Sequence, residues 1–285
     1  MFRSMVAGAL LAVTSNVAMA ADITFAVTDV EGLEQLEQEF GAVEAALEKS
    51  TGLEMDLIPV SSRTAAVEAM NAGQVNFVLT GPAEYVVMKE LTDAQIVVAW
   101  QRPDYFGQIV VLADGDISTA QDLKGKIVSF GSVGSTSQQL GPAQALADLG
   151  LKYGTDYDAQ IIKRNVAIEA LIRGDISAIG MNFGHLQKAR EAYPEVAFKV
   201  VARGPDLPND ILVASADVDA DVLAKVKKAF VEDGAAIMEA VLKGEDNDKY
   251  AGGFFLGSVD DADYDYVRSM YSTIGVDGFS GFVGD

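Results

Sequence analysis

The loop Gly134-Ser135-Thr136-Ser137 carries the residue types with the clearest chemical use in this chain. It lies between a segment with strand character and one with helical character, so its hydroxyl groups fall at the start of a helix. The first turn of a helix leaves backbone N–H groups unpaired and carries partial positive charge. Hydroxyls add neutral donors and glycine allows close approach, which together favour an oxyanion cradle. An ordinary helix cap is the alternative use of such a loop.

Two arginines and two other polar residues stand near expected strand ends. Arg63 and Arg164 each lie at or just before a helix start that follows a strand, at the sheet edge where α/β proteins bind ligands. A guanidinium offers a fork of donors that suits phosphonate, phosphate or carboxylate oxygens, and a surface salt bridge is the alternative. Tyr105 either presents its hydroxyl to a cleft or packs. Asp210 captures an ammonium group, orients an arginine or serves a turn.

The composition excludes several classes of function. The 285-residue chain has 42 acidic and 21 basic residues, no cysteine and one histidine, with a net charge of −21. Without cysteine there is no thiol nucleophile, disulfide, iron–sulfur cluster or Cys-based zinc site, and His185 alone cannot build a usual catalytic zinc centre. Nucleic-acid binding needs clustered Lys and Arg. We therefore expect no enzyme activity, no cofactor, no metal and no nucleic-acid partner.

Strands alternate with helices along most of the chain, which predicts an α/β fold with mostly parallel strands. The apolar patterns predict strands at residues 22–27, 55–60, 77–80, 96–100, 108–112, 127–130, 157–163, 176–181, 198–202 and 211–214. They predict helices at residues 33–50, 65–72, 82–89, 138–149, 166–173, 189–193 and 218–242. Short turns that contain Gly and Ser connect these segments.

The charge is not spread evenly. Residues 114–205 hold 10 basic and 10 acidic residues, whereas residues 22–112 and 206–285 each have a net charge of −11. The pattern of elements also restarts after Leu112 and breaks again near Gly204-Pro205. These breaks fit a discontinuous first lobe, residues 21–112 plus 206–285, with a second lobe inserted at residues 113–205.

The first twenty residues have the pattern of a secretory signal peptide. Arg3 gives a short positive start, residues 5–13 are apolar, and Ala18-Met19-Ala20 is a small-x-small cleavage site. The apolar run is shorter than the roughly 20 residues that a transmembrane helix needs. We expect export to the periplasm of a mature chain without a membrane-inserted segment.

Six short motifs, in this order along the chain, resemble those of the periplasmic phosphonate- and phosphite-type substrate-binding proteins of ABC importers. They are Val67-Glu68-Ala69-Met70 before Gly73; Gly81-Pro82-Ala83-Glu84-Tyr85; Asp122-Leu123-Lys124-Gly125-Lys126; Ser135-Thr136-Ser137 with Pro142; Ala170-Leu171 before Gly174-Asp175; and Leu207-Pro208-Asn209-Asp210. The resemblance covers nearly all of the mature chain. It implies a type II periplasmic-binding-protein fold, in which two α/β lobes close on the ligand, with hinges near 112–113 and 202–208.

The resemblance also implies roles for several residues. Ser135, Thr136 and Ser137 match the Ser-Thr-Ser that holds phosphonate oxygens in the family. Tyr105 matches a tyrosine that contacts the same group, and Asp210 matches an aspartate that faces the amine of aminoalkylphosphonates.

This chain departs from the family pattern at three positions. Arg63 stands where the family often has tyrosine, and Arg164 where it often has histidine. The acidic residue that contacts the amine falls near Gly184, so that contact is expected to be lost. Two guanidinium groups in place of two neutral side chains shift the expected specificity towards more negative ligands.

The resulting prediction is a monomeric periplasmic binding protein that delivers a small phosphonate, phosphite or related oxyanion to the permease subunits of an ABC transporter in the inner membrane. Three alternatives remain: binding of a sulfonate, selenate-like oxyanion or carboxylate, service to a sensor kinase, and an enzyme on the same scaffold.

Overall fold

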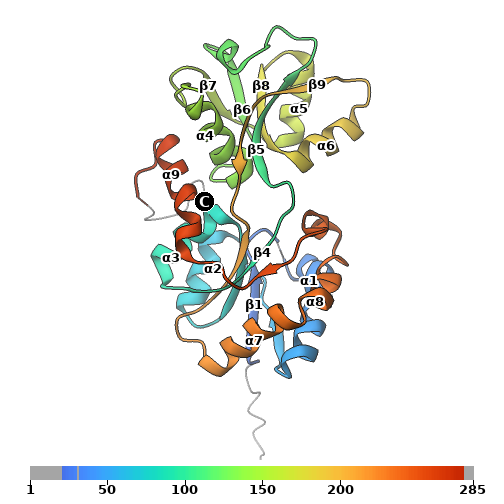
Figure 1. Ribbon diagram of the computed structural model, residues 1–285, viewed down its shortest axis with the longest axis vertical. Helices are drawn as coiled ribbons and strands as arrows, with labels where there is room; N and C mark the ends of the chain where they lie inside the picture. The colour runs from blue at the N-terminus through green and yellow to red at the C-terminus, as the bar shows by residue number, and fades with distance from the viewer. Residues whose placement is uncertain (1–20, 31, 279–285) are drawn as a thin grey trace, which may run out of the picture.

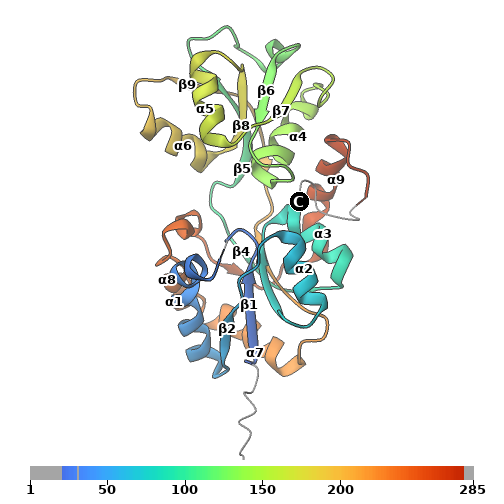
Figure 2. The ribbon, with the colours of Figure 1, turned by 180° about the vertical axis from the view of Figure 1, so that it is seen from behind.

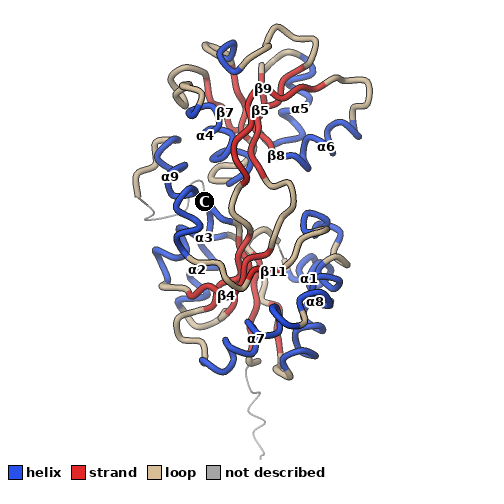
Figure 3. Tube along the Cα trace, in the orientation of Figure 1, coloured by secondary structure: helices blue, strands red, loops and turns tan. Residues whose placement is uncertain are grey.

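The computed structural model describes residues 21–30 and 32–278, and the predicted signal peptide at residues 1–20 lies outside them. Two β-sheets, each flanked by helices, lie one above the other in Figure 1, and Figure 3 shows helices on both sides of each sheet. This is the α/β class that the sequence predicts. Within the described residues, no helix has the length and apolar character needed to cross a lipid bilayer.

The first lobe is built on a six-stranded sheet in the order β11-β4-β10-β3-β1-β2. Its strands are β1 (Ile23–Val27), β2 (Met55–Leu57), β3 (Phe77–Thr80), β4 (Gln95–Trp100), β10 (Asp210–Ala214) and β11 (Phe255–Leu256). Its helices are α1 (Leu33–Thr51), α2 (Arg63–Asn71), α3 (Pro82–Thr92), α7 (Ala220–Glu232), α8 (Gly234–Val241) and α9 (Asp265–Thr273), with short 3-10 helices η3 (Glu245–Tyr250) and η4 (Asp261–Tyr264).

The second lobe is built on a five-stranded sheet in the order β7-β6-β8-β5-β9. Its strands are β5 (Phe106–Leu112), β6 (Ile127–Phe130), β7 (Asp158–Ile161), β8 (Ala178–Asn182) and β9 (Phe198–Asp206). Its helices are α4 (Gly141–Asp148), α5 (Arg164–Arg173) and α6 (Phe183–Ala192), with the 3-10 helix η1 (Ala120–Leu123) and the π-helical turn η2 (Thr136–Leu140).

Two details of the predicted organisation need correction. The strand Phe106–Leu112 pairs with β8 and β9, so it belongs to the second sheet and not, as predicted, to the first lobe. The strand directions are also mixed rather than mostly parallel. β1 runs parallel to β2 and β3, whereas β10 is antiparallel to β3 and β4. The chain returns from the second lobe at Asp210, so β10 starts at the lobe boundary and must run away from it.

Most predicted helices shift by a few residues at their ends and α9 was not predicted, and two predicted helices differ more strongly from the structure. The predicted helix 218–242 is two helices, because α7 ends at Glu232 and α8 begins at Gly234. The predicted helix 189–193 is the end of α6, which begins six residues earlier at Phe183. Asn182 starts α6 by accepting a hydrogen bond from the backbone N–H of His185, a cap that the apolar pattern does not reveal.

Apolar side chains fill both faces of each sheet. In the first lobe, one cluster packs beneath α1, α7 and α8, and a second packs beneath α2, α3 and α9. The second lobe has one cluster beneath α4 and another beneath α5 and α6. Leu140 of η2 belongs to the first-lobe cluster of α2, α3 and α9, so the lobes share apolar contacts. Helix α9 also contacts α4, and it reaches towards the second lobe in Figures 1 and 2.

The close approach of β5 to α4 in the second lobe offers a test of this packing. A Cβ added at Gly107 in β5 would meet Pro142 Cδ at 2.6 Å and Pro142 N at 2.7 Å. We therefore expect Gly107→Ala to lower the free energy of unfolding by about 1–3 kcal/mol, because the backbone of α4 has to move. Urea denaturation measures the change.

Gly41→Ala is the matched control, since Gly41 lies inside α1 and a Cβ there meets no atom within 4 Å. This substitution is expected to stabilise the protein by about 0.5–1 kcal/mol. Equal effects of the two substitutions would contradict the packing at Gly107.

Candidate functional site

A cavity of about 570 Å³ lies between the two lobes and is lined by residues of both. It brings together six of the seven predicted site residues: Arg63, Tyr105, Ser135, Thr136, Ser137 and Arg164. The carboxyl ends of β1, β3 and β6 lead into cavity-lining segments, which is the sheet edge where ligands bind in α/β folds. Asp210 does not line the cavity.

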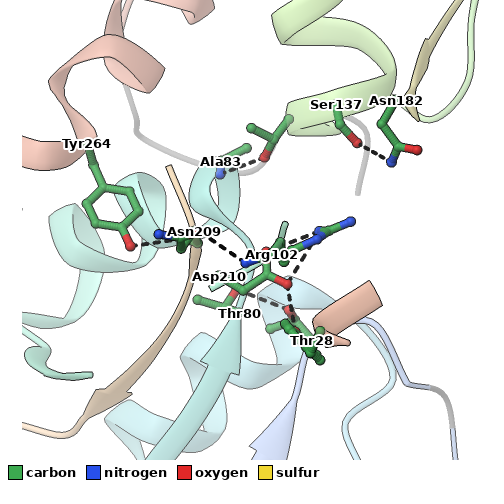
Figure 4. Close-up of polar contacts among 11 residues, drawn as sticks. Thr28, Thr80, Ala83, Arg102, Ser137, Asn182, Asn209, Asp210 and Tyr264 are labelled. Atoms are coloured by element: carbon green, nitrogen blue, oxygen red, sulfur yellow. Dashed lines mark hydrogen bonds and ion pairs between the residues drawn. The ribbon is translucent and has the colours of Figure 1, made fainter. Parts of the chain in front are cut away.

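The Ser135–Ser137 loop is held by contacts to both lobes. Gly134 donates its backbone N–H to Gln139 Oε1 at 2.7 Å, and Ser137 Oγ accepts from Asn182 Nδ2 at 3.1 Å. Thr136 Oγ1 accepts a hydrogen bond from the backbone N–H of Ala83 across the lobe boundary at 3.0 Å. Figure 4 shows the Ser137–Asn182 and Ala83 contacts. The acceptor role leaves the hydroxyl hydrogen of Thr136 available to a ligand.

Arg63 forms an ion pair inside the cavity. It begins α2, which Ser62 caps, and its Nε lies 3.2 Å from Glu84 Oε1. Its Nη1 donates to the carbonyl of Val133 in the second lobe at 3.4 Å. Burial and the nearby Asp29 raise the pKa of Glu84, the Arg63 guanidinium opposes them, and together these effects raise the pKa to about 7. One wall of the cavity thus carries a cation and a carboxylate in contact.

Asp210 occupies a different position from the predicted one. It is 3% exposed, and its carboxylate accepts from Arg102 Nη1 at 3.2 Å and from the Tyr250 hydroxyl at 2.7 Å. Figure 4 shows Arg102 beside this carboxylate. Arg102 lines the cavity, and its guanidinium lies 3.8 Å above the centre of the Tyr105 ring. Asp210 therefore orients an arginine, one of the uses that the sequence allows, and is not among the residues that line the cavity.

Arg164 has a neutral partner. It is the first residue of α5, and its Nη1 lies 2.6 Å from His185 Nε2. Burial and, to a smaller extent, the Arg164 charge lower the pKa of His185 to about 3, so the imidazole is neutral at physiological pH. Because Nε2 accepts from the guanidinium, Nδ1 carries the proton, and this buried N–H has no hydrogen-bond partner among the described residues. The positive charge of Arg164 is left without a carboxylate in direct contact within the described residues.

The charges that line the cavity balance. They come from five basic residues (Arg63, Arg102, Arg164, Lys188 and Lys249) and five acidic ones (Asp29, Glu84, Asp104, Asp246 and Asp248). The cavity therefore lacks the excess negative charge of the chain as a whole. Lys188 of the second lobe reaches Asp248 of the first at 3.4 Å, an exposed ion pair at the cavity edge.

Sequence reasoning missed Glu84, Arg102 and the contact of His185 with Arg164. Glu84 is in the motif Gly81-Pro82-Ala83-Glu84-Tyr85, where a carboxylate in the first turn of a helix that follows a strand points towards the sheet edge. This position in the sequence could have identified Glu84 as a candidate site residue. Arg102 follows β4 directly, at the same edge.

A family model and a known protein both match most of this chain. The family model described as "ABC transporter, phosphonate, periplasmic substrate-binding protein" matches residues 25–252. The phosphate-import protein PhnD of Mycolicibacterium smegmatis is 27% identical over 283 residues, which cover 89% of this chain and 86% of that protein.

Solved structures show the same fold at low identity. PhnD1 from Prochlorococcus marinus in complex with methylphosphonate has a TM-score of 0.68 at 17% identity, over 89% of this chain and 98% of that one. A binding protein component of an ABC phosphonate transporter from Pseudomonas aeruginosa has a TM-score of 0.64 at 17% identity, over 87% and 84% of the two chains.

The buried position of Asp210 leads to a stability prediction. Asp210→Ala leaves the Arg102 guanidinium, whose side chain is 15% exposed, without its carboxylate. We expect a loss of about 3 kcal/mol in the free energy of unfolding, measured by urea denaturation without ligand.

Asp206→Ala is the control, because Asp206 also pairs with an arginine but its side chain is 81% exposed. That substitution should change the stability by less than about 0.5 kcal/mol. An Asp210→Ala protein as stable as the wild type would show that Asp210 does not serve to hold Arg102.

Proposed function

This chain belongs to the family of periplasmic substrate-binding proteins of phosphonate ABC transporters, and we propose that it binds a small phosphonate, phosphite or related phosphorus oxyanion in the cavity between its lobes. It is the binding component of the transporter, so its partners are a small ligand and the transporter's permease. The printed names of its relatives, a phosphate-import protein and a protein in complex with methylphosphonate, support this class of ligand.

The observation that carries the proposal is the arrangement of donors around one cavity. The Ser135–Ser137 loop faces the cavity from the second lobe, and Arg63 lines it from the first. Arg164 adds a guanidinium whose direct partner is a neutral imidazole. Hydroxyls, helix-start N–H groups and guanidinium forks are the groups that hold a tetrahedral oxyanion.

Binding proceeds by closure of the lobes on the anion. Contacts to Arg63 come from the first lobe and contacts to Ser135–Ser137 from the second, so the ligand completes its set of donors only when the lobes are together. Closure is then a shift of population towards the state that the ligand contacts best. In our proposal the protein works as a monomer, residues 1–20 direct export, and the two lobes are the closing units.

A panel of ligands tests the proposed class. Isothermal titration calorimetry with methylphosphonate, phosphite, phosphate, methanesulfonate and acetate should give the tightest binding for one of the three phosphorus compounds. The affinity for that compound should exceed the affinity for acetate by at least about tenfold, or 1.4 kcal/mol, because acetate offers fewer oxygens to the donors. Absence of binding by all three phosphorus compounds would refute the proposed ligand class.

A single substitution tests the role of Arg164. We expect Arg164→Ala to weaken binding of the preferred ligand by about 2 kcal/mol, because a desolvated guanidinium contact is lost. Arg173→Ala on the same helix is the control, since the Arg173 side chain is 58% exposed and pairs with Glu169 and Asp175. Calorimetry that gives equal affinities for the wild type and Arg164→Ala would return Arg164 to a structural role.

A further inference from the structure

The Glu84 carboxylate is out of place in a site for an anion. Its side chain is 7% exposed, it lines the cavity, and Oε1 contacts Arg63 Nε at 3.2 Å. A buried carboxylate beside an anionic ligand costs free energy through repulsion, unless a proton lies between them. Its presence therefore needs a chemical reason.

The backbone fixes the position of this carboxylate. Glu84 is the third residue of α3, and its Oε2 would lie only 2.5 Å from a Cβ added at Gly81, the residue that precedes the helix. The absence of a side chain at Gly81 is what admits the carboxylate at this place. One oxygen thus contacts Arg63 while the other packs against the Gly81 backbone.

The groups that face Glu84 bring its pKa close to neutral pH, so that its charged and neutral forms are both populated there. They are Asp29 after β1, Arg63 on α2, Tyr105 before β5, Asp210 on β10 and Tyr271 on α9. Burial, Asp29 and Asp210 raise the pKa of Glu84, whereas Arg63 and the backbone N–H of Glu84 itself lower it. The carboxylate can therefore share a proton with a ligand near neutral pH.

We propose that Glu84 accepts the P–O–H hydrogen of the bound ligand, so that the cavity selects oxyanions that carry an ionisable proton over sulfonates of the same shape. This inference rests on the proposed function and specifies its ligand. A ligand that arrives as the monohydrogen form brings the proton with it. A ligand that arrives fully deprotonated binds together with one proton, which the buffer acid gives up to become its conjugate base. No other bond forms or breaks.

The selectivity follows from the acidity of the two ligand classes. Phosphorus oxyanions keep a proton that titrates near neutral pH, as the second pKa of about 6 of phosphate monoesters illustrates. Sulfonates are strong acids and have no such proton, so a sulfonate avoids facing a carboxylate oxygen only if Glu84 itself takes up a proton, and that costs more free energy as the pH rises above the pKa of Glu84. A site built to hydrogen-bond a substrate OH strongly rejects the analogue that lacks it.

The contact with Arg63 favours this role over capture of a ligand ammonium group. An ammonium that approached Glu84 would also approach the Arg63 guanidinium, which lies 3.2 Å from Oε1. The same guanidinium attracts the oxygens of a phosphorus oxyanion, which places the P–O–H within reach of the carboxylate. The anion and the proton acceptor therefore meet at one place.

Calorimetry at pH 8 with methylphosphonate and methanesulfonate tests the inference. The wild type should prefer methylphosphonate by at least about tenfold, because binding of the sulfonate requires protonation of Glu84 about one pH unit above its pKa of about 7. Glu84→Gln should reduce that ratio at least about tenfold, since an amide can donate to a sulfonate oxygen. Repeating the titrations in buffers of different ionisation enthalpy should show that the wild type takes up more protons with methylphosphonate than the variant does. Glu90→Gln, an exposed carboxylate on the same helix, is the control and should match the wild type.

Gly81→Ala is a second variant, which moves the carboxylate without removing it and should also lower the ratio. The inference is overturned if the wild type binds the two ligands within about threefold of each other, a result that needs no variant. It is also overturned if folded Glu84→Gln keeps both the ratio and the proton uptake. A Glu84-dependent preference for 2-aminoethylphosphonate over methylphosphonate would assign the carboxylate to an ammonium instead. If the wild type binds no phosphorus oxyanion, the proposed function itself fails.

Discussion

The free-energy cost of removing a guanidinium group from water determines how the cavity is arranged. Three arginines point into it, and each has a partner that sets its role. The charge of Arg102 is neutralised by the buried Asp210, and its guanidinium stacks on Tyr105, so Arg102 forms part of the cavity wall. Arg63 is shared between Glu84 and the space for a ligand. Among the described residues, Arg164 directly contacts a neutral imidazole and no carboxylate, so its positive charge is not neutralised by a direct partner.

The overall fold could be predicted because its helices and strands have the usual apolar patterns. What those patterns could not show was the partner of each strand. The strand at residues 106–112 is buried along almost all of its length, and an apolar strand of this kind fits either sheet equally well. Its place in the second sheet depends on pairing with residues about 70 to 100 positions later in the chain. The antiparallel direction of β10 likewise follows from where the chain returns, which no local pattern records.

A residue of the candidate site could be predicted when its place in the local pattern of strands and helices was enough to bring it to the cavity. Ser135–Ser137, Arg63 and Arg164 stand at helix starts after strands, and the structure gathers them in one cavity. Asp210 shows the limit of this reasoning, because its role depends on Arg102 and Tyr250, which are remote in sequence. A net charge of −21 first suggests that anions are repelled, whereas the lining of the cavity is neutral. The excess acidic charge lies elsewhere, where it favours solubility.

The hydrogen bond from the Ala83 backbone to Thr136 joins the lobes without the help of a ligand. It caps the start of α3 with a hydroxyl from the opposite lobe, since Gly81 has no side chain to do so. Such a contact adds the same amount to the affinity of every ligand that closes the protein. In our proposal, substitutions there would change how long any ligand is retained, whereas substitutions at Glu84 or Arg164 would change which ligand is bound. Retention and selectivity would then depend on different residues.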